Sequence, residues 1–270
     1  MHYLVIGHIC QDITPKGRVL GGTATYAALT AYALGWTTTV VTRAADDLDL
    51  SQLRGIACAR LPSDRTTTFE NIYTPSGRVQ ILHAAAGPIR SADLPAQSLT
   101  ADVVHLGPIV DEVDPELAGS FPHALVGVTP QGWLRQWGAS GRVTPRAWVD
   151  AEIILSRAGA VVTSLDDVGG DWSVVREWTS YAQVVVATQG RDGCTVYVRG
   201  VPTHVSAPSV SEVDATGAGD IFAATFFIRL QQTGDPIASA RFANCIAAGS
   251  VRRRGLDGAP APADVHACRD

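Results

Sequence analysis

Hydrophobic positions recur along the chain as short apolar runs that alternate with stretches of helical spacing. Helices are predicted over residues 22–34, ended by Gly35, and over residues 236–251, with Asp235 as N-cap and Pro236 at the first helical position. Runs rich in Val, Ile and Thr predict strands at residues 3–7, 37–43, 102–106, 124–128, 152–155, 160–163, 183–188 and 194–198. Several of these runs are continuously apolar, which is typical of strands buried on both faces of a parallel sheet. The alternation predicts a doubly wound, three-layer α/β/α sandwich with a mainly parallel central sheet.

Two further segments, residues 13–20 and 65–83, do not fit this alternation and predict β-ribbons. The second ribbon has a predicted turn at Pro75-Ser76-Gly77. We expect residues 1–270 to form one domain, in which the two ribbons make a small lid over a site. A homodimer through the lid is a further hypothesis, because an exposed ribbon edge can pair with another chain.

Composition favours a folded chain with a large core and narrows the classes of partner. Apolar residues make up 46% and charged residues 17%, with a net charge of −5. The basic tract Arg252-Arg253-Arg254, followed by Gly255, is typical of the end of a helix, so no nucleic-acid surface is expected. No apolar run approaches the ~18 residues of a membrane span. Scattered cysteines and histidines without ligand spacing predict reduced thiols, no zinc site and a cytoplasmic location.

The most informative stretch is Asp214 to Asp220, D-A-T-G-A-G-D, which runs directly into an apolar segment. Free N–H groups at a helix start, together with the helix dipole, bind anions. The small residues Gly217, Ala218 and Gly219 would let a phosphate approach these amides closely. Asp220 would lie beside that anion as a base. A helix cap or a tight turn explains a shorter match as well, but the full pattern before an apolar helix favours phosphoryl transfer to a hydroxyl.

Together these residues resemble the PfkB, or ribokinase-like, family of carbohydrate kinases over nearly the whole chain. The family's signature D-x-T-G-A-G-D is present without substitution at residues 214–220. Its Gly-Gly pair before a helix matches Gly21-Gly22, and its T-x-G-x-x-G turn matches Thr188 to Gly193. The resemblance implies a ribokinase-like fold and an ATP-dependent kinase acting on a small polyhydroxylated molecule.

The resemblance also implies a role for each matching residue. Asp220 is implied as general base, and the amides of residues 217–219 as the group that binds the moving phosphoryl. Asp12 and Gly22 are implied to hold substrate hydroxyls. Asp214, near Arg254-Gly255, is implied to bind a monovalent cation such as K⁺. The implied nucleotide contacts are Ser164, Thr188, Gly190, Gly193, Asn244 and Ala248.

The sequence departs from the family pattern at two places. Ser164-Leu165-Asp166-Asp167 replaces the family's N-x-x-E. Asp167 is still suited to hold a hydrated Mg²⁺, because that ion keeps several waters and needs only a nearby carboxylate. Ser164 is a shorter phosphate partner than asparagine. Tyr26 replaces the asparagine typical of ribokinases, which makes ribose a poor candidate substrate.

The acceptor is predicted to be myo-inositol or a related cyclitol or sugar, because residues 7–12 and 22–26 are similar to myo-inositol kinases of the family. Tyr26 either packs on the apolar face of a ring polyol or belongs to the core. Asn71 on the lid, and Gln131 and Arg135 after a central strand, are further candidate hydroxyl partners. A nucleoside kinase and a non-catalytic sugar or nucleotide sensor are the alternatives, although a sensor has no need of Asp220.

Overall fold

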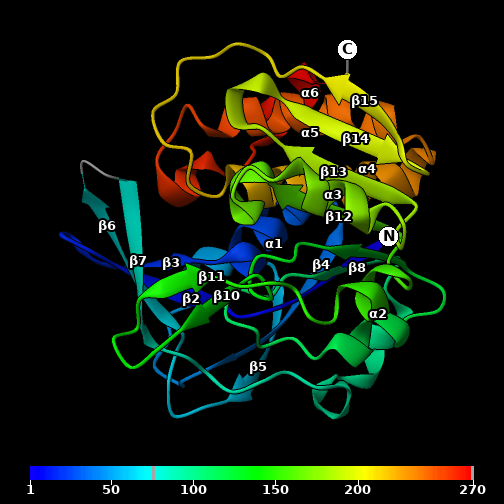
Figure 1. Ribbon diagram of the computed structural model, residues 1–270. Helices are drawn as coiled ribbons and strands as arrows, with labels where there is room; N and C mark the ends of the chain where they lie inside the picture. The colour runs from blue at the N-terminus through cyan, green and yellow to red at the C-terminus, as the bar shows by residue number, and fades with distance from the viewer. Residues whose placement is uncertain (75–76, 269–270) are drawn as a thin grey trace.

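A nine-stranded sheet forms the centre of the computed structural model, which describes residues 1–74 and 77–268 (Figure 1). Its strands are β1 (His2–Ile6), β4 (Thr37–Ala44), β5 (Ala57–Pro62), β8 (Val103–Leu106), β9 (Leu125–Val128), β12 (Ala160–Ser164), β13 (Val184–Thr188), β14 (Cys194–Val198) and β15 (Val201–Val205). The order is β15-β14-β13-β12-β9-β8-β1-β4-β5. Neighbours from β13 to β5 are parallel, and β14 and β15 are antiparallel additions. This arrangement confirms the predicted fold class.

Helices cover both faces of the central sheet (Figure 1). α1 (Thr23–Ala33), α4 (Ala218–Thr233) and α5 (Pro236–Ser250) cover one face, where Tyr3 and Val5 pack with Phe227. α2 (Ala151–Leu155) and α3 (Trp172–Trp178) cover the other face, where Leu4 and Ile6 are buried. Successive residues of β1 therefore serve opposite layers, as the two-residue period of a strand requires. α6 (Pro262–Ala267) lies beside α5. Short 3₁₀ helices span 51–53, 91–93, 96–100, 115–119, 165–168, 190–192 and 255–258.

The predicted helix ends are confirmed. α1 is followed by Gly35 with φ +83°, a conformation that favours glycine. α5 begins at Pro236, and the Asp235 carboxylate accepts hydrogen bonds from the backbone N–H groups of Ile237 and Ala238. These local signals were sufficient because the capping residue, the proline and the glycine act within one turn of the helix end.

A separate four-stranded sheet stands beside the body of the molecule and contains both predicted ribbons (Figure 1). It consists of β2 (Cys10–Thr14), β3 (Gly17–Gly21), β6 (Thr68–Thr74) and β7 (Gly77–Ala84), in the order β3-β2-β6-β7. The predicted turn at Pro75-Ser76 lies outside the described residues. A small hairpin of β10 (Arg135–Trp137) and β11 (Val143–Pro145) lies next to β7, whose Leu82 N–H donates to the Gly141 carbonyl oxygen. The function of the separate sheet as a lid stays a prediction.

One prediction about local structure was wrong, and two strands were not predicted. The strand predicted at residues 152–155 is the helix α2, because a short apolar run suits either a strand or a buried helical turn. Within it Ile154 and Leu155 are buried, whereas Ile153 is 49% exposed. Strands β5 and β15 were not predicted, since their side chains are largely exposed and lack a clear apolar pattern.

The prediction of reduced thiols was wrong for Cys245 and Cys268, which form a disulfide between α5 and the end of α6. Cys10, Cys58 and Cys194 are free thiols. The paired cysteines stand 23 positions apart, so their contact depends on how the last helices pack, which spacing does not reveal.

Among the residues that the structure describes, none of the helices is both long and apolar enough to cross a membrane. The same residues contain no cluster of three or more side chains suited to bind a metal by themselves. The cytoplasmic location stays a prediction.

Candidate active site

A cavity of about 580 Å³ lies where the carboxyl ends of the parallel strands meet the start of α4 and the separate sheet. Ligands of open α/β sheets bind at this edge, because the loops that follow the strands gather there. The cavity brings together most of the predicted site residues from distant parts of the chain. Those that line it are Asp12, Gly22, Tyr26, Asn71, Gln131, Arg135, Ser164, Asp167, Thr188, Gly190, Asp214, Gly217, Ala218, Gly219 and Asp220.

Three residues implied as nucleotide contacts, Gly193, Asn244 and Ala248, do not line this cavity. Asn244 is buried, and its Nδ2 donates to the Val205 carbonyl oxygen at 2.9 Å. Gly193 has φ +93°, and a Cβ there would lie 2.1 Å from the same Val205 oxygen. Both residues therefore support the β14–β15 hairpin. Packing of α5 on that hairpin decides which way the Asn244 side chain faces, and no spacing in the sequence reveals it.

The start of α4 is shaped by Gly217, which has φ +78°. A Cβ at this position would lie 2.3 Å from the ring of Tyr26, so both backbone conformation and space require glycine. The Ala218 N–H donates to the Ala215 carbonyl oxygen at 3.1 Å and is engaged in the turn. The N–H groups of Gly217 and Gly219 are therefore the stronger candidates among the predicted anion donors.

Asp214 fixes the loop that leads into α4. Its Oδ1 accepts hydrogen bonds from Thr216 N and Oγ1, at 2.9 and 2.6 Å, and its Oδ2 accepts from Gly255 N at 2.9 Å. Burial opposes ionisation, but the hydrogen bonds from Thr216 and Gly255 outweigh it and hold the pKa of Asp214 below its usual value. The carboxylate thus ties the loop before α4 to the segment after α5. A cation at Asp214 stays a prediction.

Asp220, in the first turn of α4, lies at the floor of the cavity. Its Oδ1 accepts a hydrogen bond from Thr23 Oγ1 at 2.7 Å, which orients the carboxylate. The pKa of Asp220 is raised to about 6: burial is the largest cause and Asp167 adds to it, whereas the Thr23 hydrogen bond and the positive charge of Arg135 act in the opposite direction. A carboxylate with this pKa is suited to accept a proton near neutral pH. Sequence analysis did not assign a role to Thr23, although its position directly after Gly22 was a signal.

The separate sheet supplies the side of the cavity opposite α4. Asp12 comes from β2, Asn71 from β6 and Gln80 from β7, and Gln80 Nε2 donates to Asn71 Oδ1 at 3.1 Å. A Cβ at Gly21 would lie 2.2 Å from Asp12 Oδ2, so this glycine makes room for the carboxylate. Gln80 was missed by sequence analysis, because only the pairing of β6 with β7 brings it to Asn71.

Carboxylates also line the cavity on the side away from the separate sheet. Gln131 Nε2 donates to Asp167 Oδ1 at 3.2 Å, and the Ser164 hydroxyl oxygen accepts from Asp166 N. Asp166, Asp167 and Asp214 all line the cavity. This donor set fits a hydrated Mg²⁺ that also binds phosphate oxygens, since Mg²⁺ needs only one or two carboxylates there.

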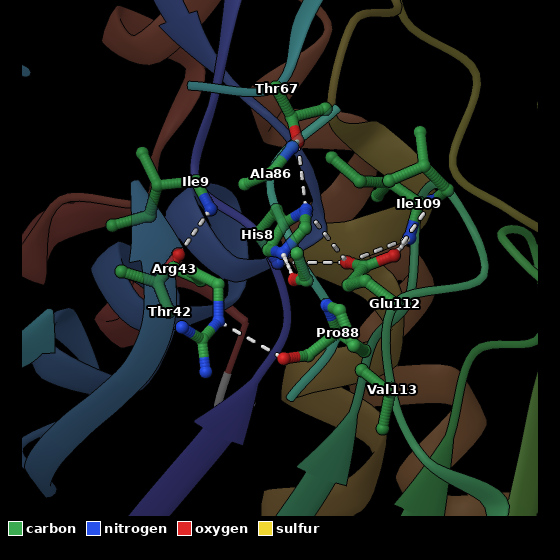
Figure 2. A network of polar contacts seen from close by, with 12 residues as sticks. His8, Ile9, Thr42, Arg43, Thr67, Ala86, Pro88, Ile109, Glu112 and Val113 are labelled. Carbon is green, nitrogen blue, oxygen red and sulfur yellow. Dashed lines mark hydrogen bonds and ion pairs between the residues drawn. The ribbon is translucent and has the colours of Figure 1, made fainter. Parts of the chain in front are cut away.

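Next to the part of the cavity wall that contains Ile109, a buried carboxylate holds several loops together (Figure 2). Glu112 is 3% exposed and accepts hydrogen bonds from the backbone N–H groups of His8, Ile109 and Val110, at 2.7–3.1 Å. The ring of His8 in turn bonds the Thr67 hydroxyl, at the base of β6. Sequence analysis missed this network because its members come from separate segments. It fixes the loop that carries Ile109 into the cavity wall.

The site places a buried carboxylate beside the N–H groups at a helix start, at the carboxyl edge of a parallel sheet and next to a polar pocket. This arrangement is typical of a phosphotransferase that acts on an alcohol. The family model of the pfkB family carbohydrate kinases matches residues 170–264. An inositol 3-kinase of Zea mays is 29% identical over 281 residues, which cover 94% of this chain and 73% of that relative. The chain is thus similar to the pfkB family over residues 170–264 and is a carbohydrate kinase.

Solved structures share the fold over almost the whole chain. A pyrophosphate-dependent kinase of the ribokinase family, complexed with a pyrophosphate analog and myo-inositol, has a TM-score of 0.84 at 24% identity, over 98% of this chain and 99% of its own. A fructokinase of Xylella fastidiosa with bound ATP has a TM-score of 0.78 at 18% identity, over 99% and 97% of the two chains. These similarities support the ribokinase-like fold.

Proposed function

We propose that the protein is an ATP-dependent cyclitol kinase, which transfers the γ-phosphate to a hydroxyl of myo-inositol or a closely related polyol. The observation that carries the proposal is the position of Asp220, between the start of α4 and a pocket lined by Asp12, Asn71 and Arg135. The similarity of 94% of the chain to an inositol 3-kinase supports the choice of acceptor.

In the proposed mechanism, one substrate hydroxyl donates its hydrogen bond to Asp220, whose orientation Thr23 fixes. Asp220 accepts the proton as the hydroxyl oxygen attacks the terminal phosphorus of the donor. The N–H groups of Gly217 and Gly219 stabilise the negative charge on the transferred phosphoryl group. Asp12 and Gly22 hold neighbouring hydroxyls, and a ring polyol packs against Tyr26.

Further parts of the proposal concern ions and assembly. Asp167 would hold a hydrated Mg²⁺, which would neutralise charge on the donor phosphates, and a monovalent cation would bind near Asp214. The chain would work as one domain over residues 1–270, with the segments about 13–20 and 65–83 as its lid. A homodimer through the lid and a cytoplasmic location complete the proposal.

A second candidate donor is inorganic pyrophosphate. The lining of the cavity includes Ser164, Thr188 and Gly190, but not the predicted nucleotide contacts Asn244 and Ala248. This lining offers contacts for phosphates without the two residues predicted to contact the nucleotide, which makes pyrophosphate the alternative to ATP. Parallel assays with ATP and with pyrophosphate, each with Mg²⁺ and myo-inositol, separate the two donors.

A substrate screen tests the acceptor. Wild-type protein is assayed with the better donor across inositols, hexoses, ribose and adenosine, and phosphorylated product is followed by ³¹P NMR. We expect the highest kcat/KM with myo-inositol or another cyclitol. Preferred turnover of adenosine would support the nucleoside kinase instead, and binding of a sugar with no turnover by either donor would support the sensor.

A further inference from the structure

A chain of buried hydrogen bonds runs from the wall of the cavity into the core beneath α4. Thr129, which follows β9 and lines the cavity, has its hydroxyl oxygen 2.9 Å from Nε2 of His105 in β8. Nδ1 of His105 lies 2.7 Å from the hydroxyl oxygen of Tyr3 in β1. Tyr3 and His105 are fully buried, Thr129 is 7% exposed, and the ring of Phe227 packs edge-on against His105.

The donor and the acceptor of each of these hydrogen bonds follow from counting the protons of the three side chains. The Tyr3 hydroxyl has no other hydrogen-bond partner among the described residues, so in a fully buried site it satisfies its proton only by donating to His105 Nδ1. Burial lowers the pKa of His105 to about 3, so the ring is neutral and carries a single proton. With Nδ1 accepting, that proton is on Nε2 and is donated to the Thr129 hydroxyl oxygen. The opposite direction would leave the Tyr3 proton buried without an acceptor, which is costly.

The hydroxyl proton of Thr129 is then available to hydrogen-bond a ligand. Its oxygen already accepts from His105, and within residues 1–74 and 77–268 no acceptor for its proton is found. Such a donor complements Asp12 and Asp220, which accept hydrogen bonds when ionised but cannot donate them. A polyol hydroxyl that donates to a carboxylate still has an oxygen that must accept a hydrogen bond.

We propose that Thr129 is a substrate-binding residue that donates its hydroxyl proton to an oxygen of the acceptor, and that Tyr3 and His105 are positioning residues that fix this direction. The inference deepens the proposed function and rests on it. The sequence alone does not reveal these hydrogen bonds, because Tyr3, His105 and Thr129 stand in separate segments. They meet only through strand pairing and the turn after β9.

The first test compares variants of Thr129 with myo-inositol as probe, using both KM and the Kd from calorimetry. Thr129→Val should raise both constants for myo-inositol roughly three- to tenfold, the size of one ordinary hydrogen bond, and leave the KM of the donor unchanged. Thr129→Ser, which keeps the hydroxyl, should stay close to wild type. Thr225→Val is the matched control, because the buried Thr225 hydroxyl has no partner among the described residues and does not line the cavity.

The second test determines which nitrogen of the His105 ring carries the proton. In ¹⁵N-labelled wild-type protein, NMR of the His105 ring should show a protonated Nε2 and an unprotonated Nδ1. Tyr3→Phe removes the hydroxyl that enforces this tautomer, so the Nδ1-protonated form should become populated and the Kd of myo-inositol should rise, by less than in Thr129→Val.

Two outcomes overturn the inference: unchanged binding of myo-inositol by Thr129→Val, or a protonated Nδ1 in the wild type. If Thr129→Val fails to fold, the serine variant, Tyr3→Phe and the wild-type spectrum still decide. Failure of the proposed function is a different result, namely no binding or turnover of any polyol by the wild type, and the ring spectrum does not depend on it.

Discussion

The two sides of the cavity are built in different ways. The proposed donor side centres on one continuous stretch, residues 214–220, and Ser164, Asp167, Thr188 and Gly190 complete it. The acceptor side is assembled from side chains of β2, β6, β7 and β10, held from behind by Glu112. The difference suggests that the chemistry rests on a local backbone conformation, whereas substrate choice rests on how separate sheets and loops meet.

The largest effect is expected from the base on the donor side. Asp220→Asn should lower kcat by roughly 10²–10⁴ while donor binding persists, because the amide cannot accept the proton. The neutral side chain also relieves the burial of a charge, so the free energy of unfolding should rise by on the order of 1–3 kcal/mol near neutral pH. Steady-state kinetics and thermal denaturation measure the two effects.

The exposed Asp47→Asn is the control for a general change of charge, and should alter neither quantity. An Asp220→Asn enzyme with full activity would contradict the assignment of the base. Lower stability with no change in kcat would make Asp220 a structural residue.

On the acceptor side, Glu112→Gln should destabilise the fold by about 2–4 kcal/mol, because the amide NH₂ would face backbone donors that now bond a carboxylate. Since Ile109 would lose its fixed position, the KM of the polyol should rise more than that of the donor. Chemical denaturation and KM values for both substrates check this. Glu116→Gln changes an exposed residue of the 3₁₀ helix that follows, and should alter neither the stability nor the KM values. Equal effects of the two variants would contradict the role of the network.

Gly217→Ala tests whether the backbone conformation at the start of α4 requires glycine. Its Cβ would meet the ring of Tyr26, and φ +78° disfavours alanine, so we expect about 1–3 kcal/mol of destabilisation and a kcat lower by about 10–100-fold. For stability, Gly219→Ala is the matched variant, because nothing lies within 4 Å of a Cβ there. Similar melting temperatures of the two variants would refute the steric explanation.

The smallest predicted effect is a shift of pH dependence. Asp220 must be ionised to act, so kcat/KM should fall about tenfold per pH unit below about 6, the raised pKa of this buried carboxyl group. Asp167 raises and Arg135 lowers that pKa. Asp167→Asn should therefore move the acid limb to lower pH and Arg135→Gln to higher pH, each by less than about one unit. Shifts in the same direction would contradict this electrostatic account.

Local signals in the sequence predicted the fold and the start of α4 well. Asp235, Pro236 and Gly35 mark helix ends within one turn, and D-A-T-G-A-G-D marks the start of α4. Local signals did not predict contacts that depend on the packing of segments far apart in the sequence. Asn244 faces the β14–β15 hairpin, and Cys245 reaches Cys268 only through the packing of α6.

The most direct test of Asp220 as the base is a titration of its own carboxyl group. Carbon-detected NMR of the labelled protein should show Asp220 titrating at about 6, at the same pH as the acid limb of kcat/KM, and Asp220→Asn should lack that limb. An Asp220 carboxyl that titrates near 4, or an acid limb that survives in Asp220→Asn, would contradict the account.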